Sequence, residues 1–192
     1  MTAVLVLMAM ALTGAAEVTA APLTVAAGAA PLSEASLSKR LLAAKATPAG
    51  MPAVHAVPSN DPEAEFGGVA DLCALKMPRG LYAAAVTGAA TEDKMTMASA
   101  FSFRTARDVA NAATSWRKAR CKGDHVVKAT LKGMPKGAVA LRLQSGRQVV
   151  GYAAVVPVGR NVVTHIVAGS PDSPAAEFAA ATRRLTRAVG PA

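Results

Sequence analysis

The stretch FSFRTARDVANAATSWRKARC, residues 101–121, decides how this chain of 192 residues folds. Its opening Phe-Ser-Phe alternates aromatic and small polar side chains, which is typical of a half-buried strand. Thr105 is a favourable helix N-cap, and Val109, Ala113 and Trp116 then recur at the i, i+4 and i+7 spacing of one helix face. The stretch therefore predicts a strand that runs directly into an amphipathic helix carrying the only tryptophan of the chain.

Periodicity and turn signals predict the elements on either side of this junction. Upstream, we expect a helix capped by Ser33 and ended by the Pro-Ala-Gly turn at 48–50, a loop over 58–68, and strands over 81–89 and 94–103. Downstream, strands are predicted over 125–131, 138–144, 148–156 and 161–168, with hairpin turns at 145–146 and 158–160. A last amphipathic helix begins at Ser173–Pro174 and ends near Val189.

This order of elements defines the fold class. Helix, two strands, helix, four strands and helix, with tight turns between strands, predict antiparallel pairing. We therefore expect an α+β fold: an antiparallel β-sheet of about five or six strands, with helices packed on one face and a C-terminal amphipathic helix. Residues 32–189 are expected to form this single domain.

The first twenty residues have the features of an export signal. An apolar run at 4–12 is followed by small residues, with Val18–Thr19–Ala20 at the place of a cleavage site. The run is too short for a membrane span of about 20 apolar residues, although no basic residue precedes it. We expect residues 1–20 to be a signal peptide, 21–31 to be a flexible mature N-terminus, and the protein to be secreted into the cell envelope or beyond.

The two cysteines fit this location. Cys73 and Cys121 are the only cysteines of the chain, and an exported chain with two cysteines is expected to form one disulfide bond. Neither cysteine has a second Cys or a His at metal-ligand spacing, and the three histidines form no such pair, so no metal site is predicted. No cofactor-binding motif was identified.

The formal net charge is +9, and it rises to +10 when residues 1–20 are removed with their one acid, Glu17. Such a surface attracts anionic polymers or lipid head groups, or it serves solubility alone. Aromatic side chains for base stacking are not interleaved with the cations, so nucleic acid is not an expected partner. The candidate contacts are the basic residues of one segment: Arg117, Lys118, Arg120, Lys122, Lys128, Lys132 and Lys136.

Catalytic patterns were not found. Gly-x-Ser-x-Gly is absent, and the neighbouring acids Asp61, Glu63 and Glu65 belong to the predicted loop. The segment 133–137 resembles a phosphate-binding loop only superficially, since it lacks the spacing and the following helix. We therefore expect a protein that is not an enzyme.

Several short motifs together resemble a known family. They are Leu41–Leu42 leading to Pro48–Ala49–Gly50, a cysteine in the following loop, the helix with its Phe, Ala, Trp and Cys, and the hairpin 158–163. This pattern is similar to the actinobacterial sensor-domain family, the extracellular domain of PknH-type serine/threonine kinases and its secreted and lipoprotein relatives. The resemblance implies an antiparallel sheet flanked by helices, a cleft for an unknown ligand, and pairing of Cys73 with Cys121. Some relatives carry a second disulfide, which this sequence lacks.

Two functions follow as expectations. The first is a non-catalytic, sensor-like domain that binds a small or lipidic ligand in a cleft between sheet and helices. Its candidate wall consists of Met95, Met97 and Val163, with His165 as a cleft-wall or core imidazole. The second is a basic surface protein that adheres to anionic wall polymer or membrane.

Overall fold

The computed structural model describes residues 30–47, 51, 55–121, 125–169 and 174–190. The predicted signal peptide and most of the predicted flexible segment 21–31 lie outside these residues. The described chain forms one open antiparallel sheet of seven strands in the order β1-β2-β3-β7-β6-β5-β4. The strands are β1 (Ala56–Pro58), β2 (Leu81–Ala90), β3 (Met95–Phe103), β4 (Val126–Ala129), β5 (Val139–Ser145), β6 (Gln148–Val158) and β7 (Asn161–Ala168). The antiparallel α+β fold is confirmed, with one strand more than the predicted maximum of six.

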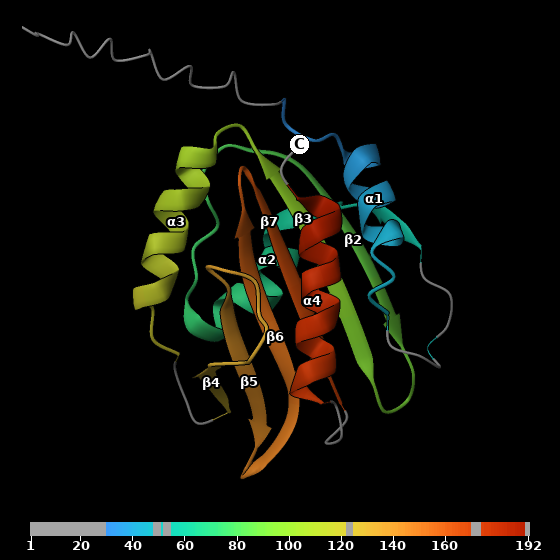
Figure 1. Cartoon of the computed structure of the whole chain (residues 1–192), viewed down its shortest axis with the longest axis vertical. Helices are drawn as coiled ribbons and strands as arrows, with labels where there is room; N and C mark the ends of the chain where they lie inside the picture. The colour runs from blue at the N-terminus through green and yellow to red at the C-terminus, as the bar shows by residue number, and fades with distance from the viewer. Residues whose placement is uncertain (1–29, 48–50, 52–54, 122–124, 170–173, 191–192) are drawn as a thin grey trace, which may run out of the picture.

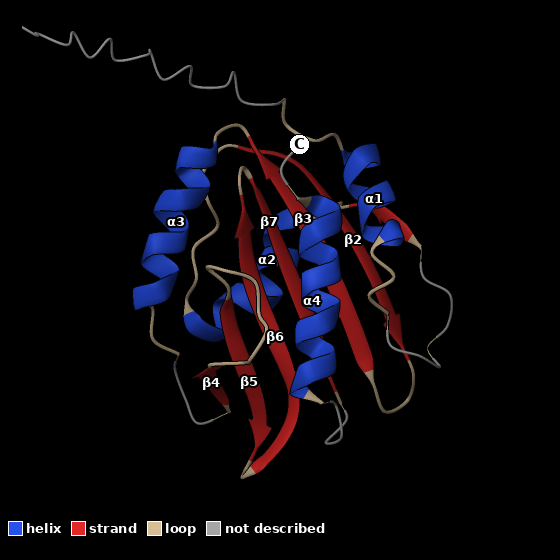
Figure 2. Ribbon diagram, viewed as in Figure 1, coloured by secondary structure: helices blue, strands red, loops and turns tan. Residues whose placement is uncertain are grey.

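Four α-helices flank the sheet: α1 (Glu34–Ala43), α2 (Pro62–Ala70), α3 (Ala106–Lys118) and the C-terminal α4 (Ala175–Val189). Ser33 caps α1 and Thr105 caps α3, each accepting a backbone N–H from the first turn, as the sequence predicts. Figures 1 and 2 show α4 lying across the sheet on the side nearer the viewer and α2 behind it.

The helices cover both faces of the sheet, so the prediction of helices on one face was wrong. On one face, Phe66 of α2 and Trp116 of α3 pack with Phe101 and Phe103 of β3 in the largest core cluster. On the other face, Leu37 and Leu41 of α1 and Leu185 of α4 pack on the alanines of β2 and β3, and Phe178 of α4 packs on β6. Residues 151–156 of β6 are continuously buried, which is the pattern of a strand covered on both sides.

The segment predicted as a loop over 58–68 contains a helix and the end of an edge strand. Asp61 accepts the backbone N–H of Ala64, and Pro62 occupies the first turn of α2. Both are favourable helix-start residues. Phe66, Val69 and Ala70 are buried and anchor the helix on the sheet despite its two glycines. Tertiary packing therefore outweighs the low helix propensity of Gly67 and Gly68.

Candidate functional site

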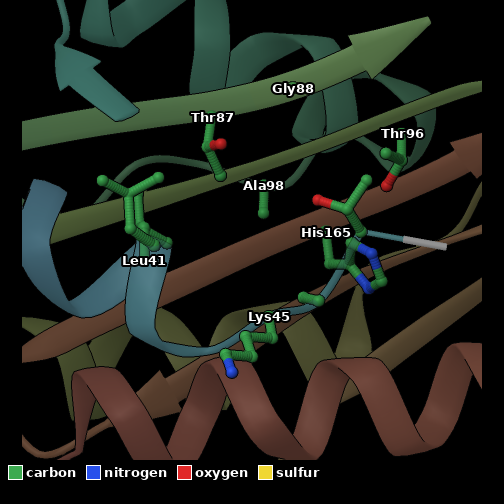
Figure 3. Close-up of a pocket in the computed structure, with 10 residues that line it drawn as sticks. Leu41, Lys45, Thr87, Gly88, Thr96, Ala98 and His165 are labelled. Carbon is green, nitrogen blue, oxygen red and sulfur yellow. The ribbon is translucent and has the colours of Figure 1, made fainter. Parts of the chain in front are cut away.

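A small pocket lies between the end of α1 and the sheet, on the face that α1 and α4 cover (Figure 3). Its volume is about 40 Å³. Leu41 and Leu42 of α1 and the following residues Lys45, Ala46 and Thr47 form one side. The opposite side consists of sheet residues: Thr87, Gly88, Thr96, Ala98 and His165.

The strand register places three of these residues in one row. Thr87 of β2 is paired with Ala98 of β3, and Ala98 is paired with His165 of β7. Adjacent strands lie about 4.8 Å apart, so the backbones of Thr87 and His165 are separated by roughly 10 Å. The methyl group of Ala98 is the only side chain between them in this row, and its small size leaves the space that forms the pocket.

His165 is 1% exposed, and two contacts with α4 fix its ring. The ring stacks on Phe178, with centroids 4.7 Å apart and planes at 3°. Its Nδ1 lies 2.9 Å from Oγ1 of Thr182. The Thr182 hydroxyl is also placed to donate its own proton to the carbonyl oxygen of Phe178, at 2.8 Å, and this assignment makes it the acceptor of a hydrogen bond from His165. The proton of the neutral imidazole therefore lies on Nδ1.

The other ring nitrogen, Nε2, is buried and has no hydrogen-bond partner within the described part of the chain. Burial, and secondarily the positive charge of Arg184, lower the pKa of His165 from 6.5 to about 3. The imidazole is therefore neutral at physiological pH, and Nε2 presents a lone pair that can accept a hydrogen bond.

Thr87 contributes a second free polar atom. Its Oγ1 is buried and has no partner among the described residues. A buried polar atom without a partner is uncommon and costs about 1–3 kcal/mol. Both atoms belong to residues that line the pocket, and each atom is itself buried with almost no surface open to solvent.

The four residues proposed from the sequence as a cleft wall do not form one wall. Met97 is paired with Ile166, and it packs with the core under α2 and α3. Val163 and His165 are paired with Ala100 and Ala98, which belong to the opposite face. Met95, in phase with Met97, is 43% exposed at the start of β3. Of the four, only His165 lines the pocket described above.

A larger and more open hollow of about 380 Å³ lies beside α2. Phe66, Leu75 and Met77 contribute apolar surface to it, and the charged residues Glu63, Asp71 and Lys76 also line it. Neither Met95 nor Met97 is among its lining residues. This hollow is therefore distinct from the cleft that the sequence predicted.

The disulfide bond joins Cys73 to Cys121, as the sequence predicts, across 48 residues. It connects the short 3-10 helix after α2, η1 (Asp71–Cys73), to the segment that follows α3. Nearby, the Trp116 ring is fully buried and its Nε1 donates to the carbonyl oxygen of Lys76 at 2.8 Å. The bond and the tryptophan thus hold the end of α3 against the α2 side of the sheet.

The predicted polyanion contacts are spread over three elements. Arg117, Lys118 and Arg120 are exposed at the end of α3, and Lys132 and Lys136 are exposed between β4 and β5. Lys128 of β4 is exposed as a residue, but its Nζ donates to the carbonyl oxygens of Trp116 and Arg117, at 2.9 and 3.1 Å. Lys128 therefore neutralises the C-terminal end of the α3 dipole. Lys122 lies outside the described residues.

No group of three or more His, Cys, Asp or Glu residues in the described part of the chain could hold a metal ion. No described helix is long and apolar enough to cross a membrane.

Comparisons with known proteins found distant structural similarity only. No family model and no curated protein sequence matches this chain. An uncharacterised protein from Mycobacterium smegmatis, the Rv0999 ortholog, is 14% identical, with a TM-score of 0.46 over 80% of this chain and 96% of that one. The extracellular domain of PknH from Mycobacterium tuberculosis is 14% identical, with a TM-score of 0.44 over 83% of this chain and 100% of that one. Both are distant similarities in the path of the chain, and membership of the sensor-domain family stays a prediction.

Proposed function

We propose that this protein is an exported, non-catalytic binding domain that takes a small polar ligand into the pocket at His165. The observation that carries the proposal is the unpartnered Nε2 of a buried, neutral imidazole that lines this pocket. Most buried polar atoms in proteins have a hydrogen-bond partner. A ligand that supplies this partner would remove the cost of leaving Nε2 and the Thr87 hydroxyl without one.

Export is supported by the apolar segment at the start of the sequence and by the disulfide bond between Cys73 and Cys121. Disulfide bonds persist in oxidising compartments and are rare in the cytosol. A binding domain in this location would meet solutes outside the cell.

A binding role fits the chemistry of the pocket better than catalysis. The described residues that line it include no carboxylate, serine or cysteine. A general acid or base works best with a pKa near the operating pH, whereas the pKa of His165 is about 3. This imidazole is suited to holding a ligand group and poorly suited to moving protons.

The size of the pocket restricts the ligand. Sites for drug-sized molecules have volumes of roughly 300–1,000 Å³, and this pocket has about 40 Å³. It can accept a small molecule or one end group of a larger molecule, and it has no room for an acyl chain. A lipid recovered with the protein would instead be assigned to the hollow of about 380 Å³ beside α2.

Narrowing the pocket tests the proposal. Ala98→Val adds two methyl groups between Thr87 and His165, and Ala90→Val, at an exposed position near the end of β2, is the matched control. Each purified protein would be screened by thermal shift against a library of small polar compounds. We expect compounds that raise the Tm of the parent and of Ala90→Val but leave Ala98→Val unchanged. The proposal fails if no compound stabilises the parent, or if Ala98→Val responds equally.

A second candidate function is adhesion to an anionic polymer or lipid surface. The exposed Arg117, Lys118 and Arg120 at the end of α3 favour it, as does the net charge of +9. Exposed charges are screened beyond about 8 Å at physiological ionic strength, so such adhesion should weaken steeply with salt. Retention on anionic liposomes should fall when Arg117, Lys118 and Arg120 are changed to Gln, while the same change at Arg147, exposed in the β5–β6 turn, should have little effect. If retention on the liposomes changed neither with salt nor with the three substitutions, this function would be excluded.

A further inference from the structure

We infer that the pocket at His165 selects a terminal hydroxyl group on an uncharged or anionic carrier, the chemistry of a small polyol or hydroxy acid. This inference rests on the proposed function and adds the ligand class to it. It follows from the polarity, the size and the charge of the pocket, each of which excludes other groups.

The hydrogen bonds between His165 and α4 determine whether its Nε2 accepts or donates a hydrogen bond. Thr182 donates to the carbonyl oxygen of Phe178 and accepts from Nδ1 of His165. The two ring nitrogens of a neutral imidazole have opposite roles, so Nε2 can only accept. A ligand group that meets Nε2 must therefore carry a donor proton. A carboxylate, phosphate, ether or carbonyl oxygen cannot supply one and would face the lone pair of Nε2.

The size of the pocket restricts the donor group. About 10–15 Å³ of space measured with a water-sized sphere is enough for one water molecule, and the pocket has about 40 Å³. A hydroxyl, or a hydroxymethyl group with its carbon in the apolar part beside Leu41 and Ala98, matches this space. A larger donor such as an indole does not fit this space.

Charge distinguishes between the remaining small donors. An ammonium group could also donate to Nε2. However, Lys45 is the one formally charged side chain among the described residues that line the pocket, and Arg184 of α4 is close enough to lower the pKa of His165. Both groups are cations and no described lining residue is an acid, so a further positive charge on the ligand is disfavoured. The favoured group is a hydroxyl on a neutral ligand, or a hydroxyl on an anionic ligand whose negative charge lies toward Lys45.

Thr87 extends the site to a second ligand atom. Its hydroxyl has no partner among the described residues and lies across the pocket from His165 in the row Thr87–Ala98–His165. Because a hydroxyl both donates and accepts, Thr87 can bind a second oxygen of the same ligand. Two oxygens on a short carbon chain are the defining feature of a polyol or a hydroxy acid.

Four small probes test this inference: ethylene glycol, glycolate, ethanolamine and acetonitrile, the last accepting hydrogen bonds without a hydroxyl or amine donor. Binding would be followed by the ¹⁵N chemical shift of Nε2 in His165 of the intact protein. We expect ethylene glycol and glycolate to shift this resonance saturably, ethanolamine to bind at least tenfold more weakly through its charge, and acetonitrile to leave the resonance unchanged. Thr87→Val should weaken the binding of ethylene glycol severalfold, whereas Thr87→Ser should bind ethylene glycol with the affinity of the parent.

The outcomes separate this inference from the proposed function. Acetonitrile binding as well as ethylene glycol would overturn the hydroxyl selectivity. Ethanolamine binding as well as ethylene glycol would overturn the exclusion of a positive charge. In either case the pocket would remain a binding site. If no probe shifted the Nε2 resonance saturably, the inference would be overturned. The thermal-shift screen with Ala98→Val would then decide separately whether the pocket binds any other ligand.

Discussion

Nδ1 of His165 on β7 lies 2.9 Å from the hydroxyl oxygen of Thr182 on α4. That hydroxyl donates its proton to the backbone carbonyl oxygen of Phe178, one helical turn earlier. The same Phe178 stacks its ring on the imidazole. One turn of α4 thus holds the plane of His165 and decides which of its nitrogens carries the proton. The other nitrogen is left as an acceptor in a residue that lines a pocket.

Removing the Thr182 hydroxyl should disturb this arrangement. Thr182→Val is nearly isosteric but leaves the Nδ1–H of His165 without its acceptor, which costs about 1–3 kcal/mol. The cost should be near the lower limit, because the proton can move from Nδ1 to Nε2. Urea unfolding would measure the loss, and Thr182→Ser, which keeps the hydroxyl, should lose much less. Equal losses in the two variants would contradict a role for the hydrogen bond.

The buried imidazole should make the fold sensitive to mild acid. The pKa of His165 is about 3 in the folded protein and 6.5 as the ordinary value. Between these values the unfolded chain binds a proton that the folded chain does not, so the free energy of unfolding falls as the pH falls. The slope should approach about 1.4 kcal/mol per pH unit below 6.5.

Comparing His165→Phe with the parent between pH 6.5 and 5, above the range where most carboxyl groups titrate, isolates this contribution. Phenylalanine keeps an aromatic ring against Phe178. It leaves no donor without a partner, because the Thr182 hydroxyl still donates to the carbonyl oxygen of Phe178. We expect the slope of unfolding free energy against pH to flatten in His165→Phe. The slope of the parent should persist in His125→Gln, a variant that changes an exposed histidine. An unchanged slope in His165→Phe would show that His165 does not bind the proton on unfolding.

The disulfide bond should provide a large part of the stability. Closing a loop of 48 residues is worth about 4 kcal/mol in the chain-entropy model, against about 5–15 kcal/mol for a whole domain. Cys121→Ser should therefore lower the Tm in oxidising buffer. Reductant should lower the Tm of the parent and leave the Tm of Cys121→Ser unchanged. A parent protein that is insensitive to reductant, with free thiols detected, would mean that the bond does not form.

The tryptophan beside the disulfide should contribute through its N–H as well as its bulk. Trp116→Phe removes the hydrogen bond to the carbonyl of Lys76 and leaves a gap in a fully buried position. Loss of the hydrogen bond alone costs about 1–3 kcal/mol, and the gap adds to it. Tyr82→Phe, at a position 51% exposed, should change unfolding free energy by less than about 0.5 kcal/mol. Similar losses in both variants would contradict the structural role of Trp116.

Local signals predicted most of the elements. The Thr105 cap and the spacing of Val109 and Trp116 are properties of a single helix, and α3 forms where they predict it. In α2, the Asp61 cap, Pro62 in the first turn and the i, i+3, i+4 spacing of Phe66, Val69 and Ala70 were equally local signals. Two adjacent glycines obscured them, because glycine is unfavourable in a helix unless packing compensates.

The faces of the sheet could not be predicted in the same way. Met97 and His165 lie on neighbouring strands, β3 and β7, which are separated in sequence by α3 and three other strands. No hairpin turn fixes their register, and a slip of one residue moves every side chain of a strand to the other face. Strand periodicity therefore identified His165 as an inward residue, but not the face that it shares with Ala98 and Thr87.

The protonation of His165 tests the central claim most directly. A ¹H–¹⁵N spectrum that correlates both ring nitrogens with their carbon-bound protons reports the tautomer and the charge of each histidine. We predict that His165 carries its proton on Nδ1, stays neutral from pH 7 down to pH 5, and shows an Nε2 resonance that shifts when ethylene glycol is added. A proton on Nε2 at neutral pH, or a ring that becomes charged near pH 6.5, would contradict the account of this pocket.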